Sequence, residues 1–168
     1  MSEIVLCCGK VCSGKSTFAS LLKRDYAFHH FSSDAWMLHF YEPTEDRRLF
    51  DERLAKCEEM IYRVSEEILV RGGNVVLDAG FWKRREREEL RVRFETVGHQ
   101  VTLVYFPVTF ERQLEYMQIR NDANPTDCYR FDRETILTLN GLFEPPSAGE
   151  PILDREEYLG GRRRPDEE

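Results

Sequence analysis

Residues 4–17 read Ile-Val-Leu-Cys-Cys-Gly-Lys-Val-Cys-Ser-Gly-Lys-Ser-Thr, an apolar run followed by a turn rich in glycine. The run 4–8 is apolar at every position, which predicts a short strand that is buried on both faces. A helix is expected to begin near Lys15, because Phe18, Leu21 and Leu22 then share one face. The stretch therefore predicts a buried strand, a tight glycine loop and a helix in direct succession.

The loop between this strand and this helix matches the pattern Gly-x4-Gly-Lys-Ser of a phosphate-binding loop. Its glycines would let backbone N–H groups converge on a phosphate, and the helix would add its positive end. We expect Lys15 to bridge the β- and γ-phosphates of a nucleotide and the Ser16 hydroxyl to ligate Mg²⁺. A chance glycine turn is the alternative interpretation. The predicted nucleotide contacts from the loop are Gly9, Lys10, Val11, Cys12, Ser13, Gly14, Lys15, Ser16 and Thr17.

Apolar runs and amphipathic segments alternate along the rest of the chain, which is typical of an α/β fold. Further strands are expected at 28–31, 75–77 and 101–106, with a short edge strand at 151–153. Helices are expected at 45–71 and 83–97, around 110–117, and at 132–142. Because the strands lack polar alternation, we expect a parallel sheet that helices cover on both faces. Such sheets bind ligands at the carboxyl ends of their strands.

Length and composition favour one ordinary globular domain. The 168 residues are 41% hydrophobic and 33% charged, and we expect a single domain over 1–159. Residues 120–127 are rich in turn formers and predict a mobile loop, whereas 160–168 predicts a disordered tail.

Charge and cysteine usage limit the classes of partner. The net charge of -7 weighs against a dedicated nucleic-acid partner, although a local basic cleft is compatible with it. The apolar run at 4–8 is too short for a signal sequence or a membrane span. The five cysteines lack metal-ligand spacing and are expected to be reduced thiols. These features favour a cytoplasmic protein with no membrane partner and leave its oligomeric state open.

Two carboxylates follow predicted strands at the expected ligand-binding edge of the sheet. Asp78 comes directly after 75–77, where it would hold Mg²⁺ directly or through water. Capping the next turn is the alternative for Asp78. Asp34 ends the second strand and would orient an acceptor hydroxyl and take its proton, unless it only caps the helix at Ala35. Together with the phosphate loop and an arginine at position 120, these carboxylates favour a small kinase in which Asp34, Lys15 and Arg120 are catalytic.

Arginines near residue 120 are candidates to stabilise the charge that accumulates on a phosphoryl group during transfer. Arg112 and Arg120 are the predicted nucleotide contacts among them, and Arg130 and Arg133 are further candidates. Because exposed arginines on helices are often only solvated, each has that alternative, and Arg120 is preferred.

The acceptor is expected between Asp34 and the segments after the second and third strands. An apolar or stacking wall, or merely helix packing, would come from Trp36, Met37, Phe40 and Tyr41. The helix expected at 83–97 carries Lys83, Arg84 and Arg85 at its start, although the helix dipole disfavours cations at this end. A bound phosphate or carboxylate would explain these cations, and a solvated helix start is the alternative. Asp34, Trp36, Lys83 and Arg84 are therefore the predicted acceptor contacts.

Five motifs occur in a fixed order: the loop 9–17, Ser33-Asp34, Leu77-Asp78-Ala79-Gly80-Phe81, Arg120-Asn121 and Phe143-Glu144-Pro145-Pro146. This set resembles the small AAA-type predicted kinases, a group allied to chloramphenicol phosphotransferase, zeta toxin and the kinase half of polynucleotide kinase. The resemblance covers about residues 3–150. It implies a P-loop NTPase three-layer α/β/α fold, with a five-stranded parallel sheet in the order 2-3-1-4-5 and a short lid.

The resemblance also implies ATP-dependent phosphorylation of a hydroxyl, with Asp34 as the base and lid arginines near Arg120. Beyond Pro151 the pattern of an adenine-contacting loop fades, so the choice between ATP and GTP stays open. The leading hypothesis is an ATP- and Mg²⁺-dependent kinase of a small molecule, such as an antibiotic, a sugar or a nucleoside. The alternatives are a polynucleotide 5′-hydroxyl kinase, which would use the arginines of 83–93, and a non-catalytic ATP-binding sensor.

Overall fold

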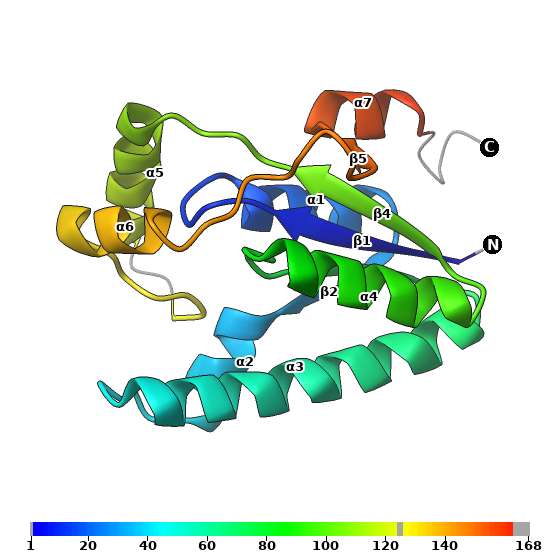
Figure 1. The fold of residues 1–168 in the computed structure, drawn as a ribbon, viewed down its shortest axis with the longest axis horizontal. Coiled ribbons are helices and arrows are strands. Elements are labelled where there is room, and N and C mark those ends of the chain that lie inside the picture. The colour runs from blue at the N-terminus through cyan, green and yellow to red at the C-terminus, as the bar shows by residue number, and fades with distance from the viewer. Residues whose placement is uncertain (1, 124–125, 163–168) are drawn as a thin grey trace.

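The computed structural model describes residues 2–123 and 126–162, which form alternating strands and helices (Figure 1). The strands are β1 (Glu3–Cys8), β2 (Phe28–Ser32), β3 (Asn74–Asp78), β4 (Gln100–Tyr105) and β5 (Ile152–Leu153). The helices are α1 (Lys15–Asp25), α2 (Ser33–Phe40), α3 (Arg47–Val70), α4 (Arg84–Thr96), α5 (Phe110–Ala123), α6 (Arg133–Asn140) and α7 (Arg155–Gly160).

The five strands form one parallel sheet in the order β2-β3-β1-β4-β5. The strand β1 is central, with Val5 paired to Val76 on β3 and to Thr102 on β4. Parallel neighbours need a crossover connection, and helices provide it between successive strands. The predicted α/β fold and the strand order 2-3-1-4-5 of a P-loop NTPase are confirmed.

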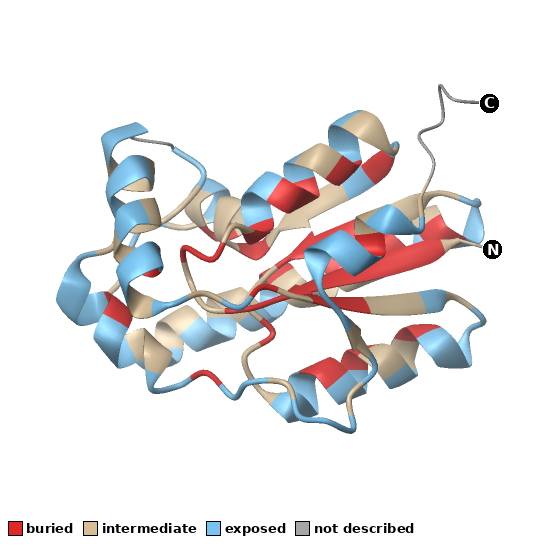
Figure 2. Ribbon diagram, turned by 90° about the horizontal axis from the view of Figure 1, so that it is seen from above, coloured by how far each residue is buried: buried red, intermediate tan, exposed pale blue. Residues whose placement is uncertain are grey.

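Two apolar clusters lie between the sheet and its covering helices. The buried residues are on the strands and on parts of the helices (Figure 2). Successive residues of β1 point to opposite faces. Ile4 and Leu6 therefore join the cluster that contains residues of α3 and α4, whereas Val5 joins the cluster with α1 and α7. All six residues of β1 are buried. The molecule thus has the predicted three layers.

The predicted mobile loop at 120–127 is wrong for its first half, because α5 continues to Ala123. Asn121 secures this last turn: its Nδ2 donates to the backbone oxygen of Phe131 (2.6 Å), and its Oδ1 accepts from the Phe131 N–H (3.4 Å). Residues that favour turns are therefore satisfied within a helix by a distant segment. Residues 124–125, in the middle of the predicted loop, lie outside the described residues.

The carboxyl-terminal segment contains a short helix that sequence patterns did not predict. Asp154 caps α7 by accepting from the backbone N–H of Glu157 (2.8 Å). Gly160, the predicted start of the tail, ends this helix. Arg162 lies over the rings of Phe28 and Tyr158 and forms an ion pair with the buried carboxylate of Glu3. Residues 163–168 lie outside the described residues.

None of the helices described here combines the length and the apolar character that a bilayer crossing requires.

Candidate functional site

The glycine loop joins the carboxyl end of β1 to the first turn of α1. Its backbone takes left-handed conformations at Cys12 (φ 53°) and Gly14 (φ 94°). A Cβ atom on Gly9 would lie 2.9 Å from the Ser13 Oγ and 3.0 Å from the Phe106 carbonyl oxygen, so only glycine fits there. Gly14 caps α1 without any side-chain hydrogen bond. The first turn of α1 therefore keeps backbone N–H groups available for an anion, as the motif predicts.

The Lys15 side chain is buried against the inner side of this loop. Its Nζ atom donates hydrogen bonds to the carbonyl oxygens of Gly9 (3.0 Å) and Lys10 (2.5 Å). Burial lowers the pKa of Lys15, and the negative charge of Asp78 partly offsets this effect. The ammonium group is thus buried among neutral oxygens of the loop, and its electrostatic partners are carboxylates farther away. This arrangement suits a site that binds an additional anion.

Asp78 ends β3, next to Ser32 in the parallel register. Its side chain is buried, and its Oδ2 lies 3.5 Å from the Nε2 atom of His30. Ser16, in the first turn of α1, is exposed. Carboxylate and hydroxyl oxygens are ligands that suit Mg²⁺. Within 2–123 and 126–162, no three His, Cys, Asp or Glu side chains converge on a metal position. Asp78 and Ser16 carry oxygen atoms of the kind that Mg²⁺ binds, and their assignment to a magnesium site stays a prediction.

Asp34 is the second residue of α2 and does not cap it. The Ser32 side chain is the cap, since its Oγ accepts from the backbone N–H of Ala35 (3.3 Å). The Asp34 side chain is 46% exposed, although the surrounding protein removes much of its hydration. That desolvation is the largest influence on the carboxyl and raises its pKa. Arg120 and Lys15 lower the pKa of Asp34, and Asp78 raises it further.

Arg120, on the last turn of α5, approaches both Asp34 and the glycine loop. Its Nη2 lies 3.8 Å from the Asp34 Oδ2, and its Nε donates to the Sγ of Cys128 (2.9 Å). The guanidinium also lies over the ring of Phe131, 5.1 Å from its centroid. Burial raises the pKa of Cys12 in the loop, and the nearby Arg120 lowers it through charge and a hydrogen bond. The structure therefore brings together the loop, Asp34 and Arg120.

Arg112 lies apart from this cluster. It is exposed in the first turn of α5, where it pairs with Glu115 (2.5 Å) and lies over the ring of Tyr116. Two predicted acceptor contacts, Lys83 and Arg84, meet the same carboxylate. The Lys83 Nζ lies 3.1 Å from the Glu144 Oε1, and the Arg84 backbone N–H donates to the Glu144 Oε2. Glu144 thus offsets the unfavourable placement of cations at the start of α4.

Trp36 is partly buried against the core and forms edge contacts with Phe31 and Phe40. The same helix borders an open pocket of about 630 Å³. Its lining residues are Ala35, Trp36, Leu38, His39, Phe40, Thr126 and Asp127. The pocket has aromatic walls and is lined by Ala35, the sequence neighbour of Asp34, so it is a candidate region for an acceptor molecule.

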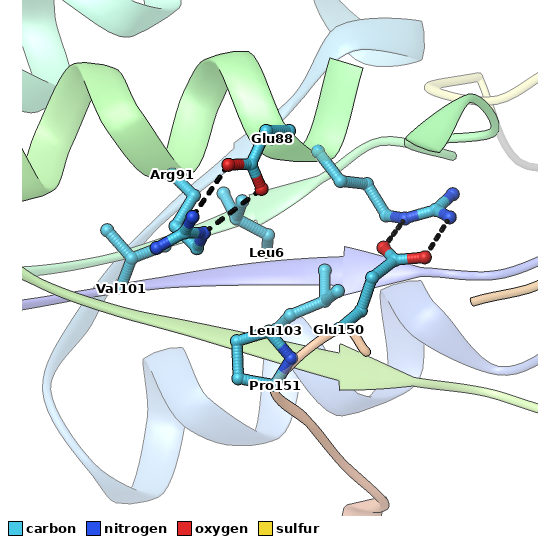
Figure 3. Close-up of a pocket in the computed structure, with 8 residues that line it drawn as sticks. Leu6, Glu88, Arg91, Val101, Leu103, Glu150 and Pro151 are labelled. Carbon is cyan, nitrogen blue, oxygen red and sulfur yellow. Dashed lines mark hydrogen bonds and ion pairs between the residues drawn. The ribbon is translucent and has the colours of Figure 1, made fainter. Parts of the chain in front are cut away.

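A second, much smaller pocket lies between α4 and the sheet (Figure 3). Its volume of about 20 Å³ has room for a water molecule but not for a substrate. Beside it, Arg87 forms two hydrogen bonds with Glu150, of 2.6 and 2.9 Å, and both side chains are buried. The Arg87 Nη1 also donates to the carbonyl oxygens of Phe81 and Glu144. This pocket therefore belongs to a structural ion pair that fixes the segment after α6.

Sequence reasoning missed three residues that border the site. Gln113, fully buried, donates from its Nε2 to the carbonyl oxygen of Val11 in the glycine loop (2.8 Å). His30 contacts Asp78, as described above. Glu58 on α3 has its pKa raised to about 7 by burial and by the charges of Glu86 and Asp34. A usable signal existed only for Glu58, a charged residue beside the apolar stripe of its helix.

Residues 4–146 match the sequence family described as the AAA domain. A Chloroflexus aurantiacus J-10-fl protein shares 17% identity over 96% of this chain and 92% of that one, with a TM-score of 0.70. A gluconokinase from Sinorhizobium meliloti 1021 shares 19% identity over 91% and 80% of the two chains, with a TM-score of 0.57.

A chain of the Pnkp1/Rnl/Hen1 RNA repair complex shares 18% identity over 84% of this chain and 43% of that one, with a TM-score of 0.65. A search among curated proteins gives no match. At these identities, the structural likeness shows a common fold.

Proposed function

We propose that this chain, which belongs to the AAA domain family, is a P-loop kinase that acts on a hydroxyl group of a small molecule. The phosphoryl donor would be ATP, used with Mg²⁺. The observation that carries the proposal is the position of Asp34, whose carboxylate lies 3.8 Å from Arg120 and is electrostatically coupled to Lys15. A phosphate-binding lysine, a carboxylate and an arginine in one cluster are the groups that phosphoryl transfer to an alcohol requires.

The glycine loop would hold the nucleotide. Backbone N–H groups of the loop and of the first turn of α1 would bind the β-phosphate, and Lys15 would turn from its carbonyl partners toward the β- and γ-phosphates. Asp78 and Ser16 would hold Mg²⁺. The bound Mg²⁺ supplies positive charge that neutralises the phosphate oxygens. These roles use nitrogen atoms of the loop and of the first turn of α1, together with oxygen atoms of Ser16 and Asp78.

Asp34 would act on the acceptor. Its carboxylate accepts a hydrogen bond from the hydroxyl and takes the proton as the new bond forms between the hydroxyl oxygen and the γ-phosphorus. The bond between the γ-phosphorus and the bridging oxygen breaks, and ADP leaves. Arg120 would meanwhile stabilise the negative charge on the transferred group. The pocket beside Ala35, Trp36 and Phe40 would hold the rest of the acceptor.

The alternative of a polynucleotide 5′-hydroxyl kinase depends on the cations of residues 83–93. Most of these side chains form ion pairs: Lys83 with Glu144, Arg85 with Glu89, Arg87 with Glu150, Arg91 with Glu88 and Glu95, and Arg93 with Glu59 and Glu66. A nucleic-acid backbone would meet these carboxylates together with the cations, so the attraction would be small. This pairing favours a small acceptor over a strand.

A transfer assay with γ-labelled ATP and Mg²⁺ tests the proposal directly. The native chain and Lys15→Ala would be compared on sugars, nucleosides, aminoglycosides, amphenicols and a 5′-hydroxyl oligonucleotide. We expect label on one class of small alcohol, and no label with Lys15→Ala. Labelling of the oligonucleotide alone would favour the polynucleotide alternative. Tight ATP binding without transfer to any alcohol would instead support the sensor hypothesis.

A further inference from the structure

The side chains of Gln113 on α5 and Asn140 on α6 form a pair of hydrogen bonds. The Gln113 Nε2 donates to the Asn140 Oδ1 (3.1 Å), and the Asn140 Nδ2 donates to the Gln113 Oε1 (2.8 Å). The same Gln113 Nε2 donates to the carbonyl oxygen of Val11 (2.8 Å). Gln113 is fully buried, so an unsatisfied amide at this position would be costly. The amide pair therefore fixes α5 and α6 against the glycine loop.

Gln113 also shares one face of α5 with Arg120. The two residues are seven positions apart, which is close to two helical turns. Arg112, one position earlier, points away from the site and is exposed with its partner Glu115. Because α5 is a rigid element, the anchor of Gln113 on Val11 sets where the guanidinium of Arg120 lies relative to the loop. Arg120 therefore lies at the site because it shares the helix face of Gln113, whereas Arg112 lies on the face of α5 exposed to solvent.

We propose that Gln113 is a positioning residue, which aligns α5 so that Arg120 reaches the γ-phosphate of a nucleotide held in the loop. This inference rests on the proposed function. Gln113 has no direct contact with the reacting atoms in this role. Its effect passes through Val11 on one side and through Arg120 on the other. Loss of Gln113 should therefore weaken interactions that depend on the γ-phosphate more than those that depend on the β-phosphate.

A double-mutant cycle on nucleotide binding tests this role without requiring turnover. The affinities for ADP and for the non-hydrolysable triphosphate AMP-PNP would be measured by calorimetry in the native chain, Gln113→Leu, Arg120→Ala and the double variant. We expect Gln113→Leu to reduce the preference for AMP-PNP over ADP by on the order of tenfold. In the Arg120→Ala background, Gln113→Leu should leave this preference unchanged. An equal loss in both backgrounds would overturn the proposal, because Gln113 would then act on the loop alone.

Two further variants serve as controls. Gln118→Leu replaces an exposed glutamine of the same helix, which hydrogen-bonds Asp122, and should retain the native preference. Asn140→Ala keeps the contact of Gln113 with Val11 and should give a smaller loss than Gln113→Leu. If Gln113→Leu fails to fold, Gln113→Asn takes its place, because its shorter side chain cannot keep the hydrogen bond to Val11, and an unchanged preference in that variant overturns the proposal.

Measurements on the native chain distinguish a failure of the proposed function from a failure of the role of Gln113. Native protein that neither prefers AMP-PNP nor transfers label from ATP would refute both the proposed function and the role of Gln113. Native protein that does both, together with additive effects of Gln113 and Arg120, would refute only the role of Gln113.

Discussion

The carboxylate of Asp34 lies 3.8 Å from the guanidinium of Arg120 and thereby links the first turn of α2 to the last turn of α5. A partly exposed pair at this distance contributes only about 0–1 kcal/mol to stability. A triphosphate can form stronger, charge-assisted hydrogen bonds with an arginine, so nucleotide binding would readily draw Arg120 away from Asp34. Asp34 would then lose a neighbour that lowers its pKa and become a stronger base once a nucleotide is bound.

Asp34→Asn keeps the shape of the side chain but removes its ability to take a proton. We expect kcat to fall by about 10²–10⁴-fold, the usual contribution of a general base. ATP affinity should change little, because the loop contacts do not involve Asp34. Steady-state transfer rates and equilibrium ATP titrations measure the two quantities. Native activity in this variant would show that another residue is the base.

Arg120→Ala removes a charge that would stabilise the transferred group, and it also changes the titration of Asp34. We expect kcat to fall by about 10²–10³-fold, as for loss of one transition-state donor. Because Arg120 lowers the pKa of Asp34, the variant should have a higher Asp34 pKa. The base is active when ionised, so the acid limb of the kcat/KM profile should move to higher pH. Arg112→Ala, whose side chain pairs with Glu115 in solvent, is the matched control and should retain native rates and a native profile. A reduced kcat with an unmoved acid limb would mean that Arg120 acts on the phosphates alone.

The parts of the fold that sequence patterns predict correctly are those with local causes. The strand, loop and helix of residues 4–17 follow from an apolar run and a motif that lie next to each other. The helix expected at 132–142 starts where predicted, because the Asp132 carboxylate accepts from the Thr135 N–H (2.7 Å) and caps α6. The order of the sheet came from the resemblance to a family, since strand order depends on contacts between distant segments.

The predictions that failed or were absent depend on partners far away in the sequence. The end of α5 was predicted as a loop because its turn-forming residues are satisfied only by contact with Phe131. Glu144 lies beside the cations at the start of α4, and nothing near residues 83–85 in the sequence indicates this contact, whereas the predicted anion at these cations stays a prediction. Gln113 is one polar residue on an ordinary helix, and nothing near it in the sequence indicates that it contacts Val11. Contacts of this kind can be identified only from the three-dimensional arrangement of the helices.

Arg87→Met should strongly destabilise the protein, because it leaves the buried Glu150 carboxylate without its main partner. Loss of one member of a buried pair costs about 3–5 kcal/mol of unfolding free energy. Arg85→Met, which breaks an exposed pair with Glu89, should change the unfolding free energy little. Urea unfolding followed by circular dichroism compares the two variants. Similar small losses in both would show that the Arg87–Glu150 pair is not a structural anchor.

The same pair predicts a pH dependence of stability. Hydrogen bonds from Arg87 lower the pKa of Glu150 to about 2. A carboxyl whose pKa is depressed in the folded state contributes stability that is fully present above its unfolded pKa of about 4.5. We therefore expect this contribution to be lost as pH falls from about 4.5 toward 2, and to be missing in Arg87→Met. Parallel pH profiles of unfolding free energy for the native protein and the variant would contradict this assignment.

Glu58→Gln should stabilise the protein at alkaline pH, the opposite of the usual effect of losing a charged side chain. Burial and the charges of Glu86 and Asp34 raise the pKa of Glu58 from about 4.5 to about 7. Between these values the folded protein keeps a proton that the unfolded chain has released, so the unfolding free energy falls as pH rises through this window. Glutamine is neutral at every pH and avoids the loss.

At pH 8 we expect Glu58→Gln to be more stable than the native protein by on the order of 1–3 kcal/mol, and at pH 4 to differ little from it. Glu59→Gln is the control, since hydrogen bonds from Arg93 and Arg63 lower the pKa of Glu59 to about 2. That variant should lose stability at pH 8, because its neutral side chain no longer pairs with these arginines. Thermal unfolding of the three proteins from pH 4 to pH 8 tests this, because the two substitutions should change stability at pH 8 in opposite directions. A Glu58→Gln variant that is less stable than the native protein at pH 8 would mean that the Glu58 carboxylate is stabilised in the folded state, contrary to its surroundings.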